Sequence, residues 1–128
     1  MMTPAMRDAV KECTSGALVA KEALAYALAH GAEHAEADHL RLLMDTAAAC
    51  GAAVDFLVRE SPHHGSICRA NAVICAACAA DARAIGTPGL RRLAEQCERC
   101  AAACEVLAAA AEAREVINQN RVEPELYA

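Results

Sequence analysis

Residues 68–104 read CRANAVICAACAADARAIGTPGLRRLAEQCERCAAAC, and six of the eight cysteines of this 128-residue chain lie in that stretch. The segment Gly86-Thr87-Pro88-Gly89 divides it near the middle. Glycine and proline end a helix there, while Thr87 and Pro88 suit the N-cap and the first position of the next one. The stretch therefore predicts two helices joined by a tight turn, over about residues 65–85 and 88–119.

The cysteines of each predicted helix share one face. An α-helix turns by about 100° per residue, so positions three, seven or ten residues apart fall close together. This gives two stripes of cysteines: Cys68, Cys75 and Cys78 on the first helix, and Cys97, Cys100 and Cys104 on the second. If the two helices pack antiparallel, both stripes can face a common core.

The remaining sequence predicts two more helices, over about residues 4–30 and 35–60. Thr3-Pro4 and Gly31 have the residue types of a helix start and a helix end, and Ser61-Pro62 ends the second helix. Gly16 inside the first helix marks either a close approach of a neighbouring helix or nothing in particular. Hydrophobic residues make up 56% of the chain but aromatic residues only 2%, which favours a thin helical core rich in alanine.

Four helices with short connections predict an all-α fold, an antiparallel up-down-up-down four-helix bundle. We expect a single domain over residues 1–128, with an irregular tail over 121–128 because it contains Pro124.

Charge and composition exclude several classes of function. The formal net charge is −5, and without a basic stripe or stacking aromatic residues we expect no nucleic-acid binding. No long uncharged apolar run predicts a membrane span, and the N-terminus does not resemble a signal peptide. We therefore expect a cytoplasmic protein with reduced thiols, in which eight cysteines indicate metal ligands or redox groups.

The predicted topology sorts the candidate ligands by position along the bundle. Cys13, Cys50 and Cys68 are expected to meet at one end, and Cys75 and Cys104 nearer the middle. The other end is expected to hold His30, His34, His39, Cys78, Cys97 and Cys100. We expect the histidines to line a mouth there through which metal enters.

The segment Cys97-Glu98-Arg99-Cys100 with Cys104, together with Cys75-Ala76-Ala77-Cys78, resembles the cysteine-rich four-helix-bundle copper storage proteins and their uncharacterised relatives. The segments His39-Leu40-Arg41-Leu42 through Cys50 to Ser61, and Ile67-Cys68, resemble the second and third helices of that family. In it, core-facing thiolates hold many Cu(I) ions. The resemblance also implies a homo-oligomer.

This sequence departs from the family pattern at several positions where the family would place cysteine. The predicted helix over residues 4–30 keeps only Cys13, and the one over residues 35–60 keeps only Cys50. The substituted positions are Ala17, Ala20, Leu24, Ala27, His39, Thr46, Asn71, Ala82, Leu107 and Ala111.

The function we expect is binding of a soft metal ion for storage, buffering or tolerance, with Cu(I) first and Zn(II) second. A purified sample without any metal is equally compatible with the sequence. The expected ligands are Cys75, Cys78, Cys97, Cys100 and Cys104, followed by Cys68, Cys50, Cys13 and His39.

Two other functions are compatible with the same residues. Buried cysteine packs like a small hydrophobic residue, so the thiols can be core filler in a bundle that acts as a non-metal interaction or assembly module. Alternatively, they can form a redox sensor that makes disulfides under stress.

Enzymatic activity has no support in the sequence. Glu36-Ala37-Asp38-His39 supplies one Glu-x-x-His pair, but a ferritin-like di-iron site needs two such pairs and two further glutamates. Cys75-x-x-Cys78 lies in mid-helix without neighbouring strands, unlike a thioredoxin-type motif.

Overall fold

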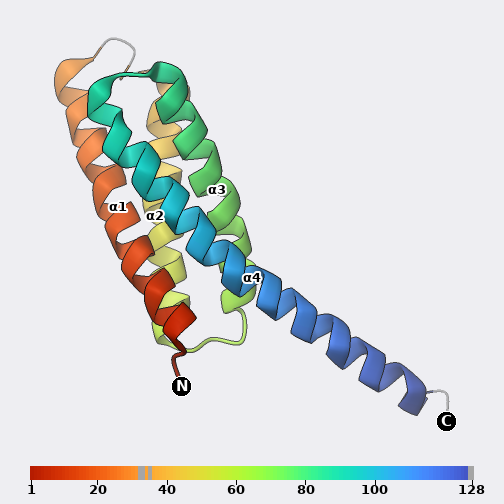
Figure 1. The fold of residues 1–128 in the computed structure, drawn as a ribbon. Helices are drawn as coiled ribbons and strands as arrows, with labels where there is room; N and C mark the ends of the chain where they lie inside the picture. The colour runs from red at the N-terminus through yellow and green to blue at the C-terminus, as the bar shows by residue number, and fades with distance from the viewer. Residues whose placement is uncertain (32–33, 35, 127–128) are drawn as a thin grey trace.

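The computed structural model describes residues 1–31, 34 and 36–126, and for residues 122–126 the backbone alone. Within these residues the elements are α1 (Pro4–His30), α2 (Ala37–Val58), α3 (His64–Ile85), the short 3₁₀ helix η2 (Pro88–Leu90) and α4 (Arg91–Leu126). The long helices run alternately up and down the bundle (Figure 1). The predicted all-α, antiparallel up-down-up-down four-helix bundle is confirmed.

Local sequence signals explain several helix ends. Thr3 caps α1, because its Oγ1 accepts a hydrogen bond from the Met6 backbone N–H at 3.1 Å. Gly86 ends α3 with a φ of 73°, a left-handed conformation in which only glycine is unstrained, and its N–H bonds to Ala82 O. None of the described helices is long and apolar enough to cross a membrane.

The end of α4 differs from our prediction. We expected the helix to stop near residue 119 and residues 121–128 to be irregular, but residues 121–126 are helical. Proline has a φ that suits a helix and disturbs only the turn before it, so Pro124 does not end α4. Residues 127–128, like the predicted helix start at Ala35, lie outside the described residues.

As a result, α4 projects beyond the other three helices (Figure 1). Its described side chains are exposed from Glu112 to Arg121. We refer to residues 113–126 as the overhang.

Two glycines allow the helices to approach closely. A Cβ atom on Gly16 of α1 would lie 3.1 Å from Cys50 Sγ and 3.6 Å from Cys100 Sγ. A Cβ atom on Gly65 of α3 would overlap the Cβ of Ala111 on α4. Gly16 therefore marks a close approach, and it brings the backbone of α1 directly against the cysteines.

Candidate metal centre

The eight cysteines fill the centre of the bundle. All are unpaired, and none is more than 1% exposed. Cys13 comes from α1 and Cys50 from α2, while α3 and α4 contribute three each. The two predicted stripes therefore do face a common core, and every helix adds to it.

Five of these sulfurs form two overlapping groups of three. Cys13, Cys100 and Cys104 make one group, and Cys50, Cys75 and Cys100 make the other, with all sulfurs of a group within 4.8 Å of one another. Cys100 Sγ lies 3.3 Å from Cys13 Sγ and 3.7 Å from Cys50 Sγ, within hydrogen-bond distance of both. Cys100 is therefore the sulfur that joins the two groups.

The other three cysteines extend this arrangement in both directions. Cys68 interacts with Cys104, and that hydrogen bond raises the pKa of Cys68. Cys97 accepts hydrogen bonds from Cys75 and Cys78, which lower its pKa to about 5. The result is one continuous thiol column, which runs from Cys68 through the two groups to Cys97 and Cys78.

Hydrogen bonds between thiols divide the column into donors and acceptors. The pKa of Cys104 is lowered chiefly by Cys100, and that of Cys50 chiefly by Cys100 and then Cys13, because an S–H donor stabilises a neighbouring thiolate. The pKa values of Cys13 and Cys75 are raised, each chiefly by its bond to Cys100 and further by burial. The column thus resists losing all of its protons unless a cation replaces them.

Asn71 is a polar side chain in the middle of the column. It is fully buried, and its Nδ2 donates to Cys13, Cys100 and Cys104 at 3.4–3.5 Å. Its Oδ1 accepts from Cys75 at 3.3 Å and lies 3.5 Å from Cys50 Sγ. The sequence marked Asn71 only as a substituted cysteine position, because periodicity places it on the inner face but says nothing of its hydrogen bonds.

The predicted separation of the ligands into two ends is wrong for Cys100. We expected Cys50 to meet Cys13 and Cys68 at one end, and Cys100 to lie at the other. Cys50 does interact with Cys13, but it also contacts Cys75 and Cys100, and Cys100 contacts Cys13 as well. The reason is that Cys50 stands near the middle of α2, and η2 precedes α4, so that Cys100 lies well inside the bundle.

His39 is the predicted histidine ligand with the most distinctive surroundings. It is 3% exposed, and its Nδ1 lies 2.5 Å from Oδ2 of Asp81 on α3. Its Nε2 is buried and has no hydrogen-bond partner among the described residues. The side chain belongs to neither three-sulfur group.

The other two histidines expected at this end surround Tyr26. His30 stacks on the Tyr26 ring with centroids 3.9 Å apart, and His34 meets the same ring edge-on at 5.1 Å. His30 is exposed and its Nδ1 bonds to Tyr26 O. These contacts make His30 an unsuitable partner for the thiol column.

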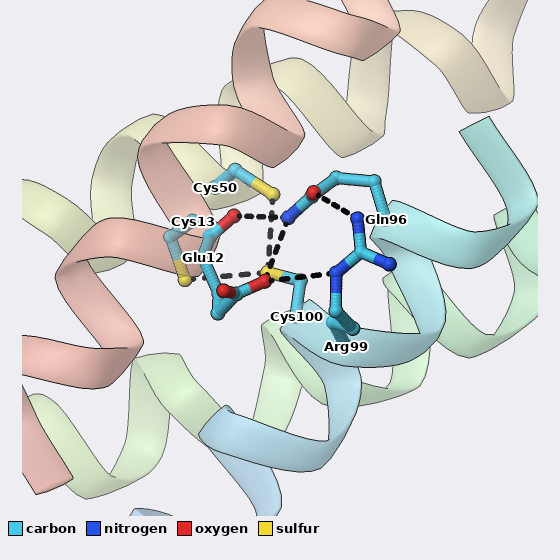
Figure 2. A network of polar contacts seen from close by, with 6 residues as sticks. All are labelled: Glu12, Cys13, Cys50, Gln96, Arg99 and Cys100. Carbon is cyan, nitrogen blue, oxygen red and sulfur yellow. Dashed lines mark hydrogen bonds and ion pairs between the residues drawn. The ribbon is translucent and has the colours of Figure 1, made fainter. Parts of the chain in front are cut away.

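A polar network beside the column was not expected from the sequence. Gln96 is 6% exposed, and its Nε2 donates to both the backbone oxygen and Oε2 of Glu12 at 3.0 Å. Its Oε1 accepts from Arg99, whose Nε also pairs with Glu12. Figure 2 shows this network next to Cys13 and Cys100. Because Glu12 precedes Cys13 and Arg99 precedes Cys100, the network fixes α1 against α4 where these two sulfurs meet.

The chain is similar to known proteins across most of its length. A protein-family profile described as "Copper storage protein" matches residues 2–109. No curated relative matches the sequence.

Three solved structures share the fold. The Nmul_A1745 protein from Nitrosospira multiformis is 29% identical, with a TM-score of 0.78 over 82% of this chain and 95% of that one. A cytosolic copper storage protein from Streptomyces lividans, loaded with five coppers, is 27% identical, with a TM-score of 0.75 over 82% and 92%. The Cu(I)-bound BsCsp3 of Bacillus subtilis is 23% identical, with a TM-score of 0.77 over 81% and 98%, which shows the fold alone.

Proposed function

This chain belongs to the copper storage protein family, and we propose that its thiol column binds and stores Cu(I). The observation that carries the proposal is the pair of three-sulfur groups that share Cys100. Every sulfur in them is buried and unpaired, and they come from all four helices. The copper-loaded relative from Streptomyces lividans supports this function, and its description as cytosolic supports storage in the cytoplasm.

The chemistry of the column suits Cu(I) better than Zn(II). Thiolates are soft ligands that select Cu(I), whereas structural zinc needs four ligands in a tetrahedron. Each group offers three sulfurs within 4.8 Å, a number that low-coordinate Cu(I) accepts. When metal binds, thiols with raised pKa values such as Cys13 and Cys75 give up their protons and become ligands.

We assign the individual ligands by position in the column. Cys100 serves both groups, with Cys13 and Cys104 on one side and Cys50 and Cys75 on the other. Cys68 extends the first side, and Cys78 with Cys97 extends the second. His39 is the proposed ligand at the mouth of the bundle, where its free Nε2 supports the role.

An anaerobic titration of the reduced protein tests the proposal. Cu(I) is added in competition with a chromophoric Cu(I) chelator, and free thiols are counted before and after loading. We expect thiol-dependent uptake of several Cu(I) ions per chain. The variant Cys100→Ser should lose more capacity than any other single substitution, because it opens both groups.

The matched control is Ala72→Ser, which puts a hydroxyl at a buried core position, on α3, without removing a thiol. It should retain the full capacity. A folded, reduced protein that takes up no Cu(I) would refute the storage function and favour an assembly module.

The redox-sensor alternative receives no support from the geometry. Reactive sensor thiols are accessible to solvent, whereas all eight here are at most 1% exposed. We therefore expect the free-thiol count of the folded protein to be stable under mild oxidant.

A further inference from the structure

We propose that Asp81 is a positioning residue, which holds His39 in the tautomer whose Nε2 binds metal at the Cys78–Cys97 end of the thiol column. This inference rests on the proposed function. It concerns how the chain presents a nitrogen ligand beside its sulfurs.

The contact between Asp81 and His39 decides where the histidine proton lies. A carboxylate only accepts hydrogen bonds, so the short contact of 2.5 Å places the proton on Nδ1 of His39. A carboxylate that accepts the second ring N–H of a metal-ligating histidine fixes the ring orientation and raises the basicity of the other nitrogen. Asp81 makes this contact with Nδ1 of His39.

The surroundings of Nε2 favour a free lone pair. His39 is 3% exposed, and Nε2 has no hydrogen-bond partner among the described residues. With the N–H at Nδ1 directed to Asp81, the other ring nitrogen carries the lone pair that can bind a metal ion.

The position of the pair connects it to the thiol column. His39 lies in the first turn of α2, at the end of the bundle where α3 ends (Figure 1). Asp81 follows Cys78 by one helical turn on α3, and its charge acts on the Cys78 thiol. Since Cys78 is the last thiol of the column on this side, the His39–Asp81 pair lies at this end of the column.

Nitrogen-15 NMR of the reduced protein tests the tautomer directly. Long-range proton–nitrogen correlation should show His39 with Nδ1 protonated and Nε2 unprotonated. On anaerobic addition of Cu(I), which is diamagnetic, the Nε2 resonance should shift strongly while Nδ1 keeps its proton. A proton on Nε2 in the metal-free protein would overturn the inference.

Variants separate positioning from simple packing. Asp81→Asn can donate to Nδ1 and so permits the other tautomer, and we expect about 10–100-fold weaker Cu(I) binding at the site that contains His39. Asp81→Glu should restore the Nδ1-protonated tautomer. The control Asp45→Asn removes the same charge from an exposed position of α2 and should change neither the spectrum nor the affinity.

The outcomes distinguish this inference from the proposed function. Cu(I) uptake by the thiols with no change at Nε2 would refute the role of His39 and Asp81 and leave storage intact. No Cu(I) uptake at all would refute the storage function itself. If Asp81→Asn fails to fold, the spectra of the unmodified protein still decide the matter.

Discussion

Asn71 shows how much one amide does among the sulfurs of a core made mostly of cysteine and alkyl groups. Its donor side faces Cys13, Cys100 and Cys104, and its acceptor side faces Cys50 and Cys75. A polar group in this position is hydrogen-bonded on both sides, which makes its burial tolerable. It therefore orders the sulfurs of both three-sulfur groups before any metal binds.

We expect Asn71→Ala to lower the free energy of unfolding of the metal-free protein by about 1–3 kcal/mol, since it leaves a small cavity and removes these bonds. Urea denaturation under reducing conditions measures the change. Asn118→Ala is the control, because Asn118 is an exposed residue of the same type on α4. Its effect should stay within about 0.5 kcal/mol; equal effects of the two variants would show that the amide contributes nothing.

At the residue level, sequence periodicity predicted the inward direction of all eight cysteines. It did not predict their partners. The contact of Cys50 with Cys75 and Cys100 depends on the relative heights of three helices, which the loops and η2 determine. The His39–Asp81 pair was also missed, because its residues are 42 positions apart and no sequence motif links Asp81 to His39.

Gly16 gives a test of how closely the helices pack. Alanine at an interior helix position is favoured over glycine by up to about 1 kcal/mol. At Gly16 the added methyl group would press on Cys50 Sγ at 3.1 Å, whereas at Gly51 of α2 a Cβ atom meets nothing within 4 Å. We expect Gly51→Ala to stabilise the protein by about 0.5–1 kcal/mol and Gly16→Ala to stabilise it less or to destabilise it.

Thermal or urea unfolding of the two variants measures this difference in stability. Cu(I) titration of both variants then compares their metal uptake. Gly16→Ala should also weaken uptake, because the methyl group displaces Cys50 and Cys100 from their shared contact. The same gain in stability and the same uptake for both variants would mean that α1 has room to move away from the column.

The second prediction at the scale of a helix concerns how much the overhang of α4 contributes to stability. Its described side chains are exposed, with Val116 at 55% and Ile117 at 54%. A chain that ends at Glu115 should therefore lose helical circular dichroism but less than about 0.5 kcal/mol of unfolding free energy. A chain that ends at Glu105 also loses the buried residues Leu107 and Ala108 and should unfold far more easily.

A large loss of stability on ending the chain at Glu115 would contradict this prediction. It would indicate that the overhang packs against a second copy of the chain. Dependence of the unfolding midpoint on protein concentration would then be expected, and it would support the homo-oligomer that the family resemblance implies.

Helix ends were predictable where one residue type decides them. Thr3 caps the start of α1, Gly31 caps its end and Gly86 caps the end of α3, each at the predicted place. Pro124 did not act as expected, because a proline near the end of a helix removes one hydrogen bond rather than the whole turn. The sequence therefore predicted the topology of the bundle better than the length of its last helix.

Across the whole molecule, the buried thiols make stability depend on alkaline pH. Hydrogen bonds to neighbouring thiols and burial raise the pKa values of Cys13, Cys68, Cys75 and Cys78 above the ordinary value of about 8.5. A group with a raised pKa in the folded state stabilises it fully below the unfolded pKa. This stability is lost as the pH rises toward the folded pKa, because the unfolded chain then holds fewer protons.

We therefore expect the metal-free protein to lose stability as the pH is raised above about 8.5, as urea denaturation at successive pH values would show. The Cu(I)-loaded protein should not show this loss, since metal has replaced the protons. Stability of the metal-free form that is constant to pH 10 would contradict the raised pKa values.

The scarcity of aromatic residues has an optical consequence. The chain contains two tyrosines, one phenylalanine and no tryptophan. Its own absorption in the near ultraviolet is therefore weak, and it has no indole fluorescence. Charge-transfer bands between thiolate and Cu(I) would stand out against this background, so the filling of the column can be followed by absorption spectroscopy of the unlabelled protein.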